Sequence, residues 1–386
     1  MDKHKVCHFK KMLLTQCVPI TLTQSIIFGL MLANRPPFLS LILFMLAWMG
    51  ILSFSACTPD DTAEEIYDLP IGNSAVMIIN EGNYTFGNAS ISYYNPLNGN
   101  LYEDIFLSQN SRPLGDVAHS MISVNGYGYG YISVNNSNKI EVVNLVDFTS
   151  VATITGLTSP RYILPLGDGR AYVSDLYAEK LTIINLNTNT AVGVVNLPGW
   201  TEQMVLANGL VFVANYDSQR VEIINPLTDS KINHIDVDGH PLEMVKDFQG
   251  QIWVLGQKEG SEGAALTRID PNLPRKELTL SFPPNEAPTD MIADPAGDFL
   301  YFINSDGIYK MATSANALPA QPMIPKGGRN YYAIGLTPDN GYLYAADALD
   351  FNQRSDVYLF NLTTGVQNAT VLKTGIISGS FYFYPR

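Results

Sequence analysis

Short apolar stretches alternate with polar turns along the chain, and similar stretches return at a regular interval. Seven of them end in Asn, Asp or Gly, and successive ends lie roughly 40 to 55 residues apart. These stretches are Met77 to Asn80, the one ending at Asn135, Tyr172 to Asp175, Phe212 to Asn215, Trp253 to Gly256, Tyr301 to Asn304, and Tyr344 to Asp347. A repeat of this length predicts seven copies of one supersecondary unit.

Each copy contains further strand patterns around the apolar stretch. Apolar and polar residues alternate in segments such as Lys180 to Leu186 and Arg220 to Pro226, which close in Asn-Leu or Asn-Pro. Turns such as Asn208-Gly209 precede the apolar stretches, as tight hairpins require. With one strand before the turn and a weaker one at the end, each unit holds four strands. The sequence therefore predicts an all-β, seven-bladed β-propeller, with a parallel β-solenoid as the alternative.

The two ends of the repeating region complement each other. The first unit begins with Ala75-Val76-Met77 and lacks its innermost strand, whereas the segment from Ser378 to Pro385 is an innermost strand with no unit after it. Pairing them would close the ring and remove its open sheet edges. We therefore expect the propeller to span residues 75–386.

An apolar run precedes the repeats. No charged residue occurs from Phe38 to Ala56, and small residues end the run just before Cys57. This layout predicts a secretory leader over residues 1–56, with Met31 as a possible true start and a permanent membrane span as the alternative. A second hydrophobic helix within residues 1–30 is a further alternative. Ser55-Ala56-Cys57 resembles a bacterial lipobox, which implies lipidation of Cys57.

Charge and cysteine content narrow the classes of partner. The chain has a formal charge of −13, and its first 56 residues hold five basic side chains and one acidic one. The remainder is thus more acidic still, which argues against nucleic acid as a partner. Residues 57–74 are acidic and lack an apolar period, as in a flexible tether. Cys57 alone would remain after cleavage, so no disulfide is expected.

Candidate binding residues follow from the expected blade geometry. The starts of the innermost strands, such as Gly115-Asp116 and Arg161-Tyr162, should meet the loops after the apolar stretches on one face, around the mouth of the central channel. Aromatic and charged side chains there suit a sizeable small molecule. The predicted ligand-binding residues are Asp116, Arg161, Tyr162, Tyr177, Trp200, Glu202, Gln203, Tyr216, Glu243, Asp290, Tyr332 and Phe351.

Sequence motifs typical of metal-binding or catalytic sites are scarce. The three histidines after Cys57 lack metal-ligand spacing, and neither a phosphate-binding glycine loop nor a Gly-x-Ser-x-Gly elbow occurs. We therefore expect no catalytic residues, metal or cofactor. An enzyme using Glu202, Glu243 or Asp290, such as a propeller lyase or lactonase, is the alternative.

Three segments carry a family resemblance. Residues 79–96 (INEGNYTFGNASISYYNP), 112–121 (RPLGDVAHSM) and 212–226 (FVANYDSQRVEIINP) resemble the YncE-like, BtuG-type propeller lipoproteins of Bacteroidetes. The resemblance spans roughly residues 75–386. It implies a lipid-anchored protein on the outer-membrane surface that captures a small molecule, cobalamin or a related corrinoid, and delivers it to a TonB-dependent transporter. A scaffold or adhesin that binds proteins or glycans is the other alternative.

Overall fold

The structure is a computed structural model that describes residues 75–384, apart from 125–127 and 260–262. The predicted leader (1–56), the tether (57–74) and Cys57 lie outside the described residues. Within them, no helix is long and apolar enough to cross a membrane.

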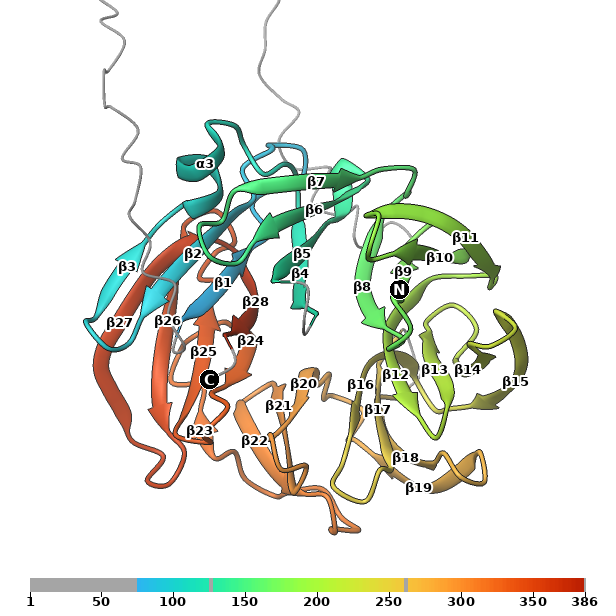
Figure 1. Cartoon of the computed structure of the whole chain (residues 1–386). Coiled ribbons are helices and arrows are strands. Elements are labelled where there is room, and N and C mark those ends of the chain that lie inside the picture. The colour runs from blue at the N-terminus through green and yellow to red at the C-terminus, as the bar shows by residue number, and fades with distance from the viewer. Residues whose placement is uncertain (1–74, 125–127, 260–262, 385–386) are drawn as a thin grey trace, which may run out of the picture. The chain divides into compact units, whose positions relative to one another are not determined.

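Seven antiparallel sheets of four strands each make up the described part, and they stand around a common axis (Figure 1). From the innermost to the outermost strand, the first four blades are β28 (Ser378–Phe383), β1 (Val76–Asn80), β2 (Ser90–Asn95) and β3 (Asn100–Tyr102); β4 (Ala118–Ser123), β5 (Tyr129–Val134), β6 (Lys139–Asn144) and β7 (Ser150–Ile154); β8 (Pro160–Pro165), β9 (Arg170–Asp175), β10 (Lys180–Asn185) and β11 (Thr190–Asn196); and β12 (Thr201–Ala207), β13 (Leu210–Asn215), β14 (Arg220–Asn225) and β15 (Ser230–Asp236). The last three are β16 (His240–Lys246), β17 (Ile252–Gln257), β18 (Ala265–Asp270) and β19 (Arg275–Ser281); β20 (Thr289–Ala293), β21 (Phe299–Asn304), β22 (Gly307–Ala312) and β23 (Ile324–Pro325); and β24 (Tyr331–Leu336), β25 (Tyr342–Asp347), β26 (Arg354–Asn361) and β27 (Gln367–Ile376). The predicted seven-bladed propeller is confirmed.

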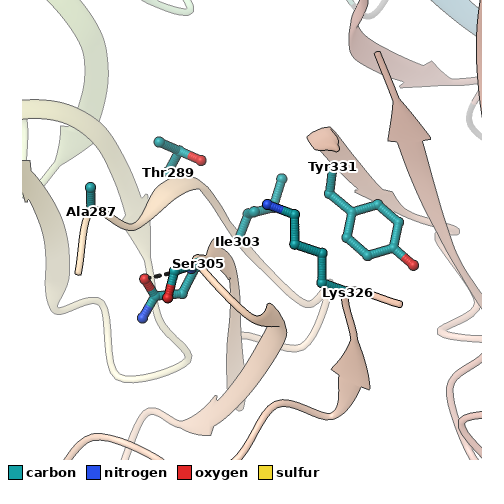
Figure 2. A pocket seen from close by; sticks show the side chains of 7 residues that line it. Ala287, Thr289, Ile303, Ser305, Lys326 and Tyr331 are labelled. Carbon is teal, nitrogen blue, oxygen red and sulfur yellow. Dashed lines mark hydrogen bonds between the residues drawn. The ribbon is translucent and has the colours of Figure 1, made fainter. Parts of the chain in front are cut away.

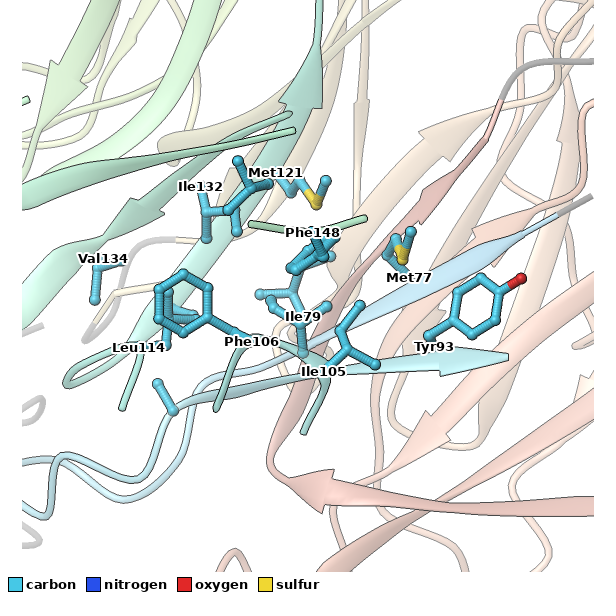
Figure 3. Packing of buried hydrophobic residues seen from close by; sticks show 14 of the residues in the cluster. Met77, Ile79, Tyr93, Ile105, Phe106, Leu114, Met121, Ile132, Val134 and Phe148 are labelled. Atoms are coloured by element: carbon cyan, nitrogen blue, oxygen red, sulfur yellow. The ribbon is translucent and has the colours of Figure 1, made fainter. Parts of the chain in front are cut away.

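The hydrophobic core lies between the blades. Seven clusters of buried apolar side chains occur in the described residues, one at each junction of neighbouring blades. Figure 3 shows the cluster between the first two blades, where Met77 and Ile79 of β1 pack near Ile132 and Val134 of β5. The apolar stretches of the sequence are the second strands, which are covered on both faces and therefore apolar at successive positions.

The first blade closes the ring as predicted. β28 pairs antiparallel with β1, so that Met77 faces Tyr382 and Val76 faces Phe383. The Tyr384 backbone N–H donates to the Ala75 carbonyl at 2.9 Å, and the Ser378 hydroxyl donates to Asn80 Oδ1 at 2.7 Å. Residues 298 positions apart in the chain thus share one buried hydrogen bond.

One α-helix in the described residues was not predicted. α3 (Ile105–Asn110) follows the first blade, and its Asp104 cap accepts a hydrogen bond from Leu107 N at 3.1 Å. Ile105 and Phe106 are fully buried in the cluster of Figure 3. The helical segment between β3 and β4 and the longer loop between β1 and β2 together account for the long interval between the first two repeats.

Candidate functional site

The innermost strands share a feature that positions the site. In each of the seven, the register with the second strand shifts once near the start, leaving one extra residue on the inner strand. Such bulges redirect a side chain out of the regular alternation. The residues at these shifts include His119, Arg161, Tyr162, Glu202, Asp290, Tyr332 and Gly379. With Glu81 and Glu243, the side chains among them form what we call the polar ring.

Arg161 and Glu202 form the central ion pair of the polar ring. Arg161 Nε lies 2.8 Å from Glu202 Oε1, and the two side chains are 19% and 1% exposed. Burial alone would lower the pKa of Arg161, but the neighbouring Glu202, Tyr162 and Glu81 raise it. The guanidinium is therefore the fixed positive charge of the ring. Trp200 Nε1 also donates to Glu202 Oε1.

Glu81 occupies the place of a missing side chain in the closing strand. Gly379 of β28 stands at the bulge, and a Cβ there would collide with the Glu81 carboxyl group. The Tyr332 hydroxyl donates to this carboxyl group, 3.2 Å from either oxygen. Burial raises the pKa of Glu81 to about 7 despite the opposing effect of Arg161. Glu81 therefore changes its protonation near neutral pH.

Two further carboxyl groups hold protons unusually tightly. Burial, followed by the charges of Asp290 and Glu202, raises the pKa of Glu243 to about 8. Burial raises the pKa of Asp290 to about 7, although Asp290 Oδ2 accepts a hydrogen bond from Ile334 N. Carboxyl groups that lie close together and away from water cannot all be ionised at once, because their negative charges repel one another. Groups with pKa values shifted in this way cluster at functional sites.

His119 and Tyr162 complete the polar ring. Their rings meet edge to face, with centroids 4.8 Å apart. Burial, and then the charge of Arg161, hold the pKa of His119 well below its usual range, so the imidazole is neutral. Neither nitrogen of His119 has a hydrogen-bond partner among the described residues, nor does Glu243 Oε2, and all three atoms are buried.

Hydrogen bonds between neighbouring inner strands hold the ring in place. The Ser380 hydroxyl donates to the His119 carbonyl at 3.0 Å, and the Ser120 hydroxyl donates to the Arg161 carbonyl at 2.6 Å. Gln203 Oε1 accepts from Met244 N at 2.7 Å. Because these side chains bind backbone groups, they fix where the ring residues stand rather than face a ligand.

Loops add aromatic groups beside the ring. Asn83 Nδ2 donates to the Phe351 carbonyl at 2.7 Å, and the Phe351 ring packs edge to face on Tyr332, with centroids 5.6 Å apart. On another blade, the Trp200 ring stacks on the Tyr216 ring, with centroids 4.2 Å apart. The centroids of the Tyr216 and His240 rings are 4.6 Å apart.

The structure brings together half of the predicted site residues. Arg161, Tyr162, Glu202, Glu243, Asp290 and Tyr332 belong to the polar ring. Trp200 and Phe351 each contact a ring residue, and Tyr216 stacks on Trp200. Gln203 instead bonds to β16, and Tyr177 is 64% exposed in its loop.

One strand start was predicted wrongly. Gly115-Asp116 was expected to start an inner strand, but β4 begins at Ala118 and His119 stands at the bulge. Asp116 Oδ2 accepts hydrogen bonds from Thr85 N at 2.8 Å and from Asn136 Nδ2. This carboxylate therefore holds the segments around Thr85 and Asn136 together. Glu81 was also missed, although it directly follows the apolar stretch Met77 to Asn80 and so lies in a loop that was expected at the channel mouth.

The ring offers hydrogen-bond acceptors, a neutral imidazole and one guanidinium within a short space. The described residues contain no group of three or more His, Cys, Asp or Glu side chains placed to hold a metal ion. Protonated carboxyl groups can donate hydrogen bonds, and ionised ones can accept them. The arrangement therefore suits a ligand with several amide, hydroxyl or amine groups.

We predict that Glu243→Gln stabilises the protein at high pH. A carboxyl group whose pKa rises on folding supports stability below its unfolded pKa and loses that support as the pH rises toward about 8. Because a glutamine side chain does not ionise, the variant does not lose stability in this way. The free energy of unfolding should match wild type at pH 5 and exceed it at pH 8.5 by about 1–3 kcal/mol, since one pKa unit is worth ~1.4 kcal/mol.

Denaturant unfolding at the two pH values measures this difference. Glu103→Gln is the matched control, because that side chain is 61% exposed and should give no such pH-dependent gain. Equal stability of wild type and Glu243→Gln at pH 8.5 would contradict the prediction.

Fold and polar ring together define a seven-bladed propeller with a charged, aromatic-flanked site at one end of its axis. The chain belongs to the family described as "Domain of unknown function (DUF5074)", whose model matches residues 74–385. A comparison with curated proteins finds no match.

Solved structures share the fold at low sequence identity. A quinonprotein alcohol dehydrogenase-like protein from Bacteroides thetaiotaomicron has a TM-score of 0.64 and 14% identity, covering 82% of this chain and 79% of its own. The periplasmic gluconolactonase of Pseudomonas aeruginosa has a TM-score of 0.62 and 11% identity, covering 81% of this chain and 99% of its own. At such identities the likeness concerns the fold alone.

Proposed function

We propose that the polar ring binds a small molecule and that this protein is a ligand-capturing propeller rather than an enzyme. One observation carries the proposal: in the described residues, His119 Nδ1, His119 Nε2 and Glu243 Oε2 are buried polar atoms without a partner. Leaving such atoms unsatisfied costs about 1–3 kcal/mol each, so a bound ligand that satisfies them gains affinity.

The best single candidate for the ligand is cobalamin or a related corrinoid. A corrinoid is a flat macrocycle fringed with amide groups, which could donate to ring carboxylates and accept from protonated ones. Tyr332 and Phe351, in edge-to-face contact beside Glu81, offer aromatic surface to such a macrocycle. The resemblance to the BtuG-type lipoproteins supports the same choice.

The proposed setting is the outer face of the outer membrane. Lipidation at Cys57 would anchor the chain through acyl groups, and the captured ligand would pass to a TonB-dependent transporter. The apolar run ending just before Cys57 supports this setting. An intact-mass measurement of the membrane-extracted protein tests it.

We predict that calorimetric titration of the chain from Asp60 onward with hydroxocobalamin gives a dissociation constant near 1 nM, about −12 kcal/mol. His119→Ala should weaken binding at least tenfold. The control is His234→Ala, because that side chain is 39% exposed on β15, an outermost strand.

Two results would overturn the proposal. One is the absence of saturable heat with corrinoids, haem and siderophores alike. The other is turnover of a sugar lactone by the wild-type protein that disappears in Glu243→Gln, which would point to an enzyme.

A further inference from the structure

A small pocket lies directly beside the polar ring, between the sixth and seventh blades. Its volume is about 170 Å³, and Thr289, Ser305, Lys326 and Tyr331 line it (Figure 2). Thr289 directly precedes Asp290 and Tyr331 directly precedes Tyr332, so two of its residues are chain neighbours of ring residues. The pocket and the ring therefore adjoin at the starts of β20 and β24, where consecutive Cα atoms are about 3.8 Å apart.

Lys326 gives this pocket its charge. The backbone around it is fixed, since Lys326 N donates to the Asp306 carbonyl at 2.7 Å and Arg329 N donates to the Lys326 carbonyl at 3.0 Å. Figure 2 shows the side chain extending across the pocket, with its amine toward the Thr289 hydroxyl. Among the described residues, no ion pair involves the Lys326 ammonium group.

The nearby carboxyl groups are engaged elsewhere. Glu286 Oε2 accepts a hydrogen bond from the pocket residue Asn304 at 2.6 Å. Asp306 accepts from the Tyr309 hydroxyl at 2.8 Å, and Asp290 accepts from Ile334 N. The next basic residue, Arg329, lies over the Tyr358 ring at 3.9 Å and donates to Gln367. Lys326 is therefore the cation that an anion entering this pocket would meet.

We propose that the Lys326 pocket is an anion subsite, which takes a phosphate or carboxylate group of the small molecule whose body binds the polar ring. This inference rests on the proposed function. In the ring, Arg161 is already paired with Glu202, and the remaining carboxyl groups attract donor groups and repel an anion when they are ionised. Lys326 instead attracts an anion. The two regions together would select a ligand with a donor-rich body and one anionic substituent, and would fix its orientation.

The first arm of the test uses inorganic phosphate and acetate as probes. Lysines are converted to their ¹³C-dimethyl forms, and the Lys326 resonance is assigned by its absence in Lys326→Gln. We expect phosphate, acetate or both to shift it saturably, with a dissociation constant of about 1–10 mM. Lys180, which starts β10 on another blade, is the control and should show no saturable shift.

The second arm compares cobinamide phosphate with cobinamide, which differ by the anionic group. Lys326→Gln should weaken binding of the phosphate about tenfold and leave cobinamide unchanged. Equal shifts at Lys326 and Lys180, or none at either, would overturn the subsite. The first arm needs no corrinoid, so a failure of the ring to bind corrinoids is distinguishable from a failure of this pocket.

Discussion

Deletion of residues 378–386 is expected to leave a chain that does not fold into a soluble monomer. The deletion removes β28, and β1 becomes an edge strand although all five of its residues are buried in the complete protein. Two core clusters also open, because Phe381 and Phe383 pack on one side of the first blade and Tyr382 and Tyr384 on the other. An exposed apolar edge of this kind promotes aggregation.

Size-exclusion chromatography and circular dichroism measure the outcome. We expect aggregated material without a cooperative thermal transition. A synthetic peptide of residues 377–386, added during refolding, should restore part of the monomer, whereas a scrambled peptide should not. A truncated chain that elutes as a monomer and melts at the wild-type temperature would show that closure contributes little.

Much of this fold could be predicted because the second strand of each blade is covered on both faces. That position requires unbroken apolar residues, as in Phe212 and Val213, and makes the repeat visible. The surplus strand at the C-terminus was visible for another reason: the count of repeats left one innermost strand with no unit after it. Helix α3 was not, because six residues are too few to show a helical period, and its stability comes from burying Ile105 and Phe106.

The polar ring was harder to predict than the fold. Inner-strand starts such as Arg161-Tyr162 were placed correctly, because a turn and an apolar strand bracket them. His119 was missed because Gly115-Asp116 looked like the strand start, whereas Gly115 only bridges to Ala89 and β4 begins three residues further on. Glu81 could have been suggested by Gly379, the residue without a side chain at the bulge of the closing strand.

Pairwise interactions among the ring residues follow from the fold and not from any local pattern. Glu202 and Arg161 are 41 residues apart in the chain, and Glu81 and Tyr332 are 251 apart. Each lies on a different blade. Packing of consecutive blades brings Arg161 to Glu202, and closure of the propeller brings Glu81 to Tyr332. The raised pKa of Glu81 therefore could not be read from its neighbours in sequence.

Arg161→Met is expected to destabilise the protein by about 3–5 kcal/mol, the usual cost of removing one partner of a buried ion pair. Glu202, which is 1% exposed, would lose the positive charge that favours its ionised form. Glu81 would lose the same support. Urea denaturation at pH 7 measures the change in the free energy of unfolding. The loss should be smaller at pH 5, because burial raises the pKa of Glu81 to about 7 and raises that of Glu202, so protonation at lower pH removes the stranded charges.

A double variant separates the ion pair from packing. Adding Glu202→Gln to Arg161→Met removes the stranded charge and should recover part of the lost stability, whereas a purely steric effect of the methionine would stay. Arg220→Ala is the surface control, because Arg220 and Asp236 are 39% and 73% exposed and such pairs contribute about 0–1 kcal/mol. If Arg161→Met costs no more than Arg220→Ala, the charge of Arg161 does not support the ring carboxylates. The ring would then owe its geometry to the hydrogen bonds that join side chains of one inner strand to backbone groups of the next.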